Sequence, residues 1–381
     1  MRAVSEHKKV VIKIGSAVLM REGFALDRGA FCRLVNEIAA ASREGYEPII
    51  VSSGAVAAGR RLLGMSKKPV RTDRSIPVLQ ALAALGQSRL IQLYDTEFHH
   101  YDLNVAQLLL TRDDFNDRRR YLNARNALEE VCAFGVIPVI NENDTVATDE
   151  IRFGDNDQLA ALVATMVGAE LLVLLSDIDG LYSANPQLDR AAKKFDQVCA
   201  LDPSLDAMVS DVKDPVRDGS GGMRTKLLAA RIAARTGIST VIAPGKKIGV
   251  VGEVLAGVPG VGTVLTPERD GERLDARRAW IGLGVVPVGR ISCDAGAVRA
   301  VCQKGKSLLP TGITGVEASF VGGDVVELVD PAGQAFARGI TAYASTEVDR
   351  IKGVKSREIE GVLGFKITDA VVHRNDLMLL E

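Results

Sequence analysis

The sequence predicts an α/β fold, in which a mostly parallel sheet is sandwiched by helices and is followed by a small β-rich domain. Two observations support this prediction. Short apolar runs of strand-forming residues alternate with helical patterns through the first 265 residues, which is typical of parallel sheets covered on both faces. Beyond a charged stretch at 267–280, the strand-like runs are short and separated by glycines.

The alternation begins with a strand at Val10–Ile14 and a helix that Asp27 can cap. This helix runs to about Arg43 and places Leu34, Val35 and Ile38 on one face. Further strands are predicted at Pro48–Val51, Val105–Leu110, Val136–Ile140, Leu171–Leu175 and Thr240–Ala243. Further helices are predicted at Gly54–Leu63, Ile76–Phe98, Asn116–Ala133 and Met223–Arg235.

The charged stretch indicates a linker, because eight of the fourteen residues at 267–280 are charged. We therefore expect one domain over residues 1–266 and a second over residues 277–381. The second contains strand-like runs and two short helical stretches, at Pro287–Ser292, Asp324–Val329, Gln334–Ile340, Ser345–Ile351 and Ser356–Leu363.

Composition excludes several functional classes. The net charge of −1 over 381 residues gives no bulk attraction to nucleic acid or to anionic membranes. The five cysteines are scattered and form no CxxC pair, which favours a reducing cytoplasm over a disulfide framework or a zinc site. The N-terminal residues lack the apolar core of a signal peptide. The longest apolar run, at 159–175, is broken by Gly168 and Glu170, so it predicts a helix, a turn and a strand and no membrane span.

Polar segments follow the predicted strands, where open α/β sheets bind their ligands. Lys13 lies at the end of a buried strand, and the next residues, Gly15 and Ser16, would let backbone N–H groups approach a phosphate; an edge lysine that reaches solvent is the equally weighted alternative. The segment Ser52–Ala55 opens a helix and could bind an anion, although an ordinary serine cap is the simpler interpretation.

The most polar of these segments is Asn141–Asp157, with six acidic residues and three asparagines in seventeen positions. Its side chains could orient an amino acid or ligate Mg²⁺ through water, whereas a solvated loop is the simpler alternative. A fourth segment, Ser220–Lys226, places two glycines and a lysine before a helix and could cradle an anion; a flexible loop is its alternative. It lacks the spacing of a P-loop.

Two features are set aside. Gly305-Lys306-Ser307 resembles the end of a P-loop, but Ala300 occupies the position of the first glycine, so we assign it no phosphate-binding role. Histidine catalysis is also not expected, since only four histidines occur and His99 and His100 are neighbours that end a predicted helix.

Taken together, the motifs resemble the glutamate 5-kinase family, which has the amino acid kinase fold. The resemblance covers nearly the whole chain, and SLLPTGITGVEASFVGGDVVELVD is similar to a PUA domain. In chain order, the other segments that carry it are VIKIGSAVL, IVSSGAVAAGRRLLG, ALAALGQSRLIQLY, LLLTRDDF, RRRYLNARNALE, VIPVINENDTVATDEIRFGDNDQLAALVA, LLSDIDGLY and SGGMRTKLLAA.

The resemblance implies phosphorylation of the L-glutamate side chain by ATP, the first step of proline biosynthesis, with Mg²⁺ required. It also implies inhibition by proline and a homodimer or homotetramer. The catalytic residues would be Lys13, Lys226 and Asp157, with Asp157 orienting the two lysines. L-Glutamate would be bound by Ser53, Asp144 and Asn156. ATP would be bound by Lys13, Ser176, Asp177, Ser220, Gly221, Gly222, Met223, Arg224, Thr225 and Lys226.

Two positions depart from the family pattern. Many members have threonine in place of Ser176, which keeps the hydroxyl, and some have lysine in place of Arg152, to which we give no catalytic role. No residue is assigned as a metal ligand. A carboxylate nucleophile is already ionised at neutral pH, so no general base is needed.

Other functions remain open at this point. Acetylglutamate kinase and aspartokinase also phosphorylate carboxylates, but the NEND and GDND segments and the PUA-like tail argue against both. A regulatory RNA-binding protein with a degenerate kinase domain is a further alternative, which the intact set of lysines and polar residues argues against. From Ala276 onward, thirteen Lys and Arg stand against twelve Asp and Glu, so RNA binding by the PUA-like region has no basic footprint.

Overall fold

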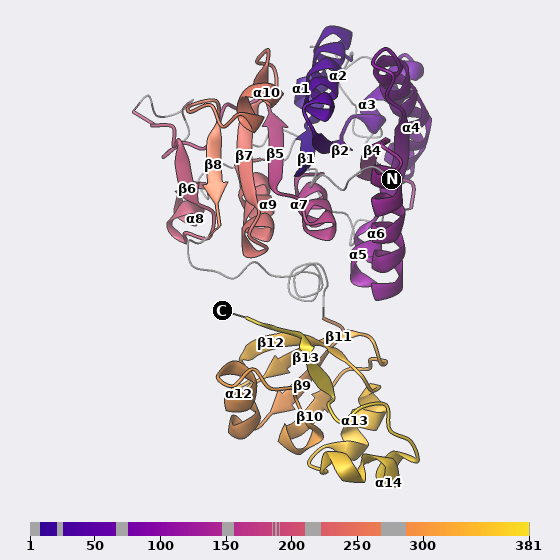
Figure 1. Cartoon of the computed structure of the whole chain (residues 1–381), viewed down its shortest axis with the longest axis vertical. Helices are drawn as coiled ribbons and strands as arrows, with labels where there is room; N and C mark the ends of the chain where they lie inside the picture. The colour runs from indigo at the N-terminus through magenta and orange to yellow at the C-terminus, as the bar shows by residue number, and fades with distance from the viewer. Residues whose placement is uncertain are drawn as a thin grey trace. The chain divides into compact units, whose positions relative to one another are not determined.

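The structure is a computed structural model, and it describes residues 8–20, 26–65, 75–146, 156–184, 186, 189, 191–209, 222–267 and 287–380. The chain divides into two compact units. The first contains a large sheet with most of its helices, and the second contains residues 287–380 together with Asp113–Leu122 (Figure 1). The expected linker lies outside the described residues apart from Pro267.

The first unit is built on one sheet with the strand order β3-β4-β2-β1-β5-β7-β8-β6. Neighbouring strands are parallel except β7 and β8, so the prediction of a mostly parallel sheet is confirmed. The strands are β1 (Lys8–Ile14), β2 (Tyr46–Ser52), β3 (Val105–Leu110), β4 (Ile137–Glu142), β5 (Leu171–Ser176), β6 (Gln197–Cys199), β7 (Ser239–Pro244) and β8 (Thr263–Thr266).

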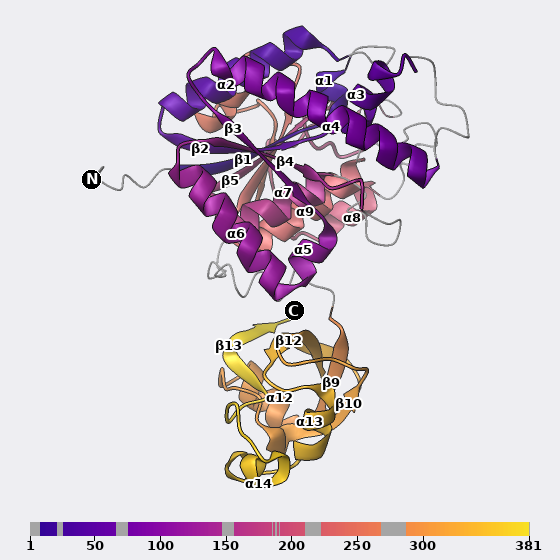
Figure 2. The ribbon, with the colours of Figure 1, turned by 90° about the vertical axis from the view of Figure 1, so that its right-hand side faces the viewer.

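Helices cover both faces of this sheet, with α2, α3 and α4 on one side and α6, α7 and α9 on the other (Figure 2). The helices that precede the second domain in the chain are α1 (Ser16–Leu19), α2 (Arg28–Arg43), α3 (Ala55–Leu62), α4 (Ile76–His99), α5 (Arg112–Asn116), α6 (Arg118–Ala133), α7 (Asn156–Val167), α8 (Ser204–Val209), α9 (Met223–Arg235) and α10 (Val250–Leu255). The sandwich predicted from the alternating pattern is therefore present.

Helix α2 shows how local sequence sets these elements. The Asp27 carboxylate accepts a hydrogen bond from Ala30 N at 3.2 Å, as expected of a cap. The predicted face of Leu34, Val35 and Ile38 is fully buried in the main hydrophobic core. The apolar periodicity thus fixes which side of the helix meets the sheet.

The second unit is a five-stranded sheet with the order β10-β9-β11-β12-β13. Its strands are antiparallel except for the β9–β11 pair, and its core includes Ile291, Leu328 and Tyr343. Its elements are β9 (Gly289–Cys293), α12 (Ala295–Cys302), η3 (Pro310–Gly312), β10 (Ile313–Glu317), β11 (Val325–Val329), β12 (Ala335–Thr341), α13 (Ser345–Ile351), η4 (Ser356–Glu358), α14 (Ile359–Leu363) and β13 (Val372–Leu379). The sequence did not predict α12, β10 or β13.

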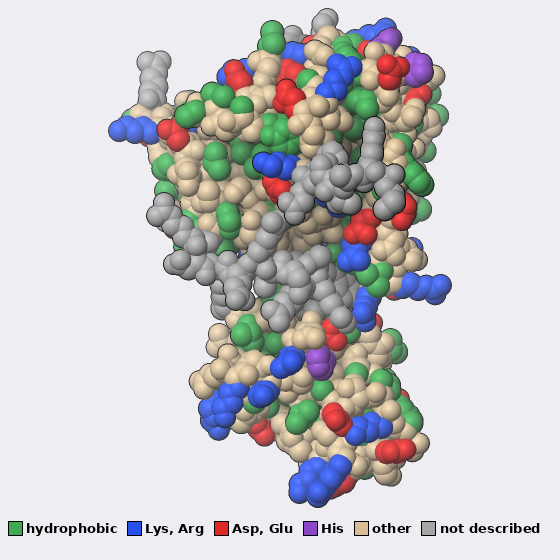
Figure 3. Space-filling view, in the orientation of Figure 1, with side chains coloured by type: hydrophobic (Ala, Val, Ile, Leu, Met, Phe, Trp, Pro, Cys, Tyr) green, Lys and Arg blue, Asp and Glu red, His purple; other side chains and the backbone are tan. Residues whose placement is uncertain are grey.

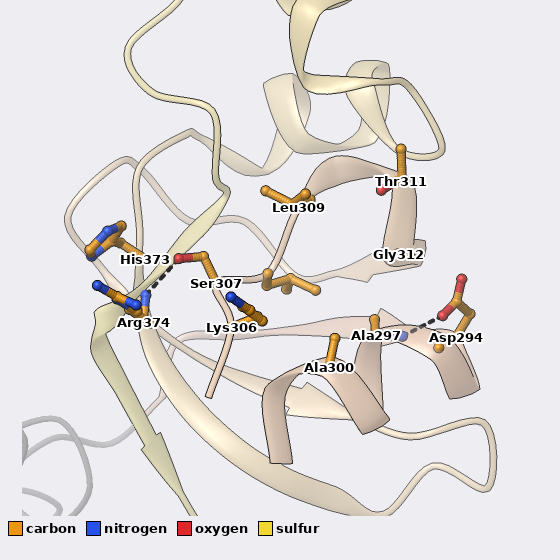
Figure 4. Close-up of a pocket in the computed structure, with 12 residues that line it drawn as sticks. Asp294, Ala297, Ala300, Lys306, Ser307, Leu309, Thr311, Gly312, His373 and Arg374 are labelled. Carbon is orange, nitrogen blue, oxygen red and sulfur yellow. Dashed lines mark hydrogen bonds between the residues drawn. The ribbon is translucent and has the colours of Figure 1, made fainter. Parts of the chain in front are cut away.

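A pocket of about 670 Å³ opens in the second unit between α12, η3 and β13. Lys306, Ser307, His373 and Arg374 lie together at one end of it (Figure 4). Lys306 and Ser307 belong to the rejected P-loop-like segment, which follows helix α12 and so lacks the strand–turn–helix context of a P-loop. On the face shown in Figure 3, acidic side chains lie among the basic ones of this unit.

Candidate active site

Three of the four polar segments expected to bind ligands follow neighbouring strands of the sheet, and Ser176 ends the next strand along. In the order β4-β2-β1-β5, every pair is parallel, so the carboxyl ends of these strands lie along one edge. The register places Ile14 of β1 beside Ser52 of β2 and beside Leu175 of β5. The segments after Lys13, Ser52 and Ile140 are thus brought together with Ser176, whereas the fourth expected segment, Ser220–Lys226, leads into α9 and follows none of these strands.

Three of the predicted residues form a buried ionic cluster. Lys13 Nζ lies 2.5 Å from Asp157 Oδ1, and Lys226 Nζ lies 3.0 Å from Asp157 Oδ2. Asp157 is fully buried, and each lysine is only 4% exposed. The three side chains come from β1, α7 and α9, so residues separated by more than 200 positions in the sequence meet at one carboxylate.

The two lysines keep this carboxylate ionised. Burial by itself would raise the pKa of Asp157, but the charges and hydrogen bonds of Lys13 and Lys226 outweigh it and hold the pKa below its ordinary value. Thr225 Oγ1 also donates to Asp157 Oδ2, at 3.1 Å. A charged aspartate in the first turn of α7 is further favoured by the helix dipole.

Asn156, the residue before Asp157, is surrounded by neutral hydrogen-bonding groups. Asn156 Nδ2 lies 2.9 Å from each of three acceptors, Ser52 O, Ser53 Oγ and Asn141 Oδ1. Two of the predicted substrate-binding residues, Ser53 and Asn156, are therefore in direct contact. The third, Asp144, lies half-buried in the turn that follows β4.

The start of α3 is shaped by glycines that allow close backbone approach. Gly54 caps α3 in the left-handed region, at φ 113°, where a side chain would be strained. A Cβ on Gly86 of α4 would lie 1.8 Å from Ala55 O, so α3 and α4 pack with their backbones in contact. This packing fixes the Ser52–Ala55 segment against α4.

The predicted nucleotide-binding residues lie on β5 and α9. Ser176 ends β5, and its hydroxyl donates to Asp177 Oδ1 at 3.1 Å. Gly222 caps α9, whose first turn holds Met223, Arg224, Thr225 and Lys226. Ser220 and Gly221 lie outside the described residues, as does Arg152.

Comparison with known proteins decides the family. Residues 8–244 match the model of the amino acid kinase family, and residues 289–363 match the PUA domain. The chain belongs to the amino acid kinase family. Within this family it is 47% identical over 373 residues to the glutamate 5-kinase of Citrifermentans bemidjiense, covering 98% of each chain. The glutamate 5-kinases of Saccharophagus degradans and Pseudomonas putida are 44% and 46% identical over 377 residues, covering 99% of this chain and 98% and 99% of theirs.

Two further residues lie at the carboxyl edge of the sheet, and the sequence analysis gave neither of them a role. Asn141, the penultimate residue of β4, contacts Asn156, and Gln87 on α4 contacts Asn141. A signal for Gln87 was available, since it interrupts the buried face of α4 formed by Leu82, Gly86 and Leu90. Among the described helices, none is long and apolar enough to cross a membrane.

Proposed function

We propose that this chain transfers the γ-phosphoryl group of ATP to the side-chain carboxylate of L-glutamate. The products are ADP and L-glutamate 5-phosphate, which would start the biosynthesis of proline. The observation that carries the proposal is the buried Lys13–Asp157–Lys226 cluster at the carboxyl edge of the sheet. The high identity with named glutamate 5-kinases over nearly the whole chain supports the choice of substrate.

The chemistry requires an anion to attack a polyanion. A carboxylate oxygen of glutamate forms a new bond to the γ-phosphorus, and the bond from that phosphorus to the bridging β,γ-oxygen breaks, leaving the electron pair on ADP. The nucleophile has an ordinary pKa of about 4.3 and is ionised at neutral pH. Catalysis therefore rests on positioning and on stabilising the charge of the transferring group.

Lys13 and Lys226 are placed to stabilise that charge. Each ammonium group is held on a different oxygen of Asp157, so the carboxylate sets their separation. Because both lysines are buried, their interaction with phosphate oxygens is weakly screened by water. Asp157 acts as a positioning residue in this scheme and does not exchange a proton.

ATP would bind where β5 ends and α9 begins. Backbone N–H groups at the amino end of α9 point out of the helix and, with the helix dipole, favour phosphate. Gly222 at the cap leaves room for a close approach, since none of the described residues lies within 4 Å of where its Cβ would be. Ser176 and Asp177 offer polar contacts to the rest of the nucleotide.

Mg²⁺ fits this site as a companion of ATP. Among the described residues, no three His, Cys, Asp or Glu side chains are grouped to hold a metal ion, and each oxygen of Asp157 faces a lysine. The ion would be held by phosphate oxygens, as is usual for Mg²⁺ with nucleotides, and would neutralise part of their charge.

L-Glutamate would bind at the neutral part of the edge. Ser53 and Asn156 lie in contact there, and Asp144 follows on the same segment as Asn141. Proline carries the same α-carboxylate and an ammonium group, so it would compete for this site. Inhibition kinetics test this point, because a non-competitive pattern against L-glutamate would contradict it.

Two further parts of the proposal concern assembly and location. The family resemblance supports a homodimer or homotetramer, which light scattering of the purified chain would test. All five cysteines are free thiols, which supports a reducing cytoplasm. Localisation of a tagged chain outside the cytoplasm would contradict this.

The acceptor can be identified by trapping the product. Purified protein is incubated with MgATP and hydroxylamine, which converts an acyl phosphate to a stable hydroxamate. We expect hydroxamate with L-glutamate and little with L-aspartate or N-acetyl-L-glutamate. Hydroxamate formed mainly from either of the other two acids would assign the chain to a different carboxylate kinase.

A further inference from the structure

Three buried amide side chains join helix α4 to the start of α7. Asn141 Nδ2 donates to Gln87 Oε1 at 2.8 Å, and Asn156 Nδ2 donates to Asn141 Oδ1 at 2.9 Å. Gln87 is 8% exposed and Asn141 is 3% exposed. Gln87 follows Gly86, whose close contact with Ala55 O holds this part of α4 against the start of α3.

Backbone groups fix the orientation of all three amides. Ser52 O can only accept, so the Asn156 atom 2.9 Å away must be the NH₂ group. Glu142 N–H can only donate, so the Asn141 atom that it meets at 2.9 Å must be the oxygen. The NH₂ group of Asn141 then faces Gln87, which must present its oxygen. The orientation therefore follows from chemistry and is independent of how amide atoms are assigned.

This orientation decides what Asn156 can offer a ligand. Its two N–H protons are shared among three acceptors, and among the described residues no donor reaches its Oδ1. Ser53 Oγ already accepts from Asn156, so its hydroxyl proton can be donated elsewhere. The pair thus presents one acceptor, which suits an ammonium group, and one donor, which suits a carboxylate.

Gln87 is poorly explained by stability alone. Its Nε2 is buried and has no hydrogen-bond partner among the described residues. A buried donor without a partner destabilises the folded state, whereas an apolar side chain of similar size would avoid that cost. What glutamine contributes here is the oxygen that accepts from Asn141.

We propose that Gln87 is a positioning residue for recognition of the substrate's α-ammonium group, acting through Asn141 and Asn156. Without its oxygen, the NH₂ group of Asn141 would be buried without an acceptor. Turning the Asn141 amide would bring its nitrogen toward the nitrogen of Asn156, which disrupts the orientation that leaves Asn156 Oδ1 to accept from a ligand. This inference rests on the proposed function, because it assumes that an amino acid is the acceptor.

The test compares two substitutions and two ligands. Gln87→Met removes the oxygen with little change in size, and Gln87→Glu keeps an acceptor oxygen in either protonation state. L-Glutamate is compared with glutarate, which lacks only the amino group and is measured as a competitive inhibitor. Gln92→Met makes the same change at an exposed position of α4 and is the matched control.

We expect Gln87→Met to raise the KM for L-glutamate about tenfold, the effect of leaving one buried donor without its partner. The inhibition constant of glutarate, kcat and the KM for ATP should stay within about twofold of wild type, since the loss concerns ground-state binding of the ammonium group. Gln87→Glu should restore most of the affinity for L-glutamate, and Gln92→Met should match wild type.

An unchanged KM for L-glutamate in Gln87→Met would overturn the inference, as would an equal loss of glutarate binding. If Gln87→Met fails to fold, Asn141→Ala interrupts the same chain of amides at its middle link and should give the same pattern. A wild-type protein inactive on L-glutamate would instead refute the proposed function. The two failures are therefore distinguishable.

Discussion

Helix α7 begins with two adjacent side chains that enter opposite environments. Asp157 is surrounded by full charges, with a lysine on each oxygen, whereas Asn156 is surrounded by neutral dipoles. Successive residues of a helix point about 100° apart, so one turn of backbone can serve two sites. The ionic cluster is therefore suited to stabilising charge that develops during the reaction. The amide network is suited to binding a ligand of fixed shape.

The largest effect is expected when a charge is removed from the ionic cluster, and this substitution tests whether the two environments have different roles. We expect Lys226→Ala to lower kcat roughly 10²- to 10³-fold, the range found when one stabilising group of a transition state is lost. The KM for L-glutamate should change little, because Lys226 acts on the phosphoryl group. Steady-state kinetics measure both values.

The matched control for this prediction is Lys8→Ala. Lys8 is exposed at the amino end of β1, the opposite end from Lys13, so its loss should leave both kinetic constants unchanged. A wild-type kcat in Lys226→Ala would remove this lysine from the mechanism.

A second prediction concerns Asp157, the carboxylate that both lysines contact. Asp157→Asn should lower the free energy of unfolding by about 3–5 kcal/mol at neutral pH, because it leaves two buried ammonium groups without their carboxylate. The folded-state pKa of Asp157 lies below its unfolded value. Its stabilisation is therefore complete above the unfolded pKa and is lost as pH falls through the folded one.

Denaturant unfolding of both proteins across pH tests the sign of this effect. The difference in unfolding free energy between wild type and Asp157→Asn should be constant from neutral pH down to about 5, where an unfolded aspartate begins to bind protons. Below that pH the difference should shrink. A difference that grows on acidification would mean that burial, and not the lysines, controls the pKa of Asp157.

The two environments also differ in how far the sequence could predict them. The strand Val105–Leu110 and the helix Met223–Arg235 have the predicted bounds. Lys13, Asp157 and Lys226 could be selected as a set only through family resemblance. Their meeting depends on β1 lying between β2 and β5, an order that local patterns do not encode.

Shorter or less apolar elements escaped prediction for physical reasons. Strands β6 and β8 have three and four residues, too few to show a period of two. Helix α12 does carry a local signal, since Asp294 accepts from Ala297 N at 2.6 Å as a cap, but the helix has only eight residues. Gln87 does interrupt an apolar helix face, but the sequence alone does not show that its partner is Asn141, which lies 54 positions away.

The smallest effect is expected from the neutral side of the comparison. Asn156→Ala should raise the KM for L-glutamate roughly tenfold or more, while kcat and the KM for ATP change far less, because uniform binding of the substrate is lost. Asn126→Ala, on the exposed face of α6, is the matched control. If Asn156→Ala lowered kcat as strongly as Lys226→Ala does, the two environments would act as one unit. The assignment of charge stabilisation to the Asp157 cluster and of substrate binding to Asn156 would then be wrong, even with both sets of contacts correctly described.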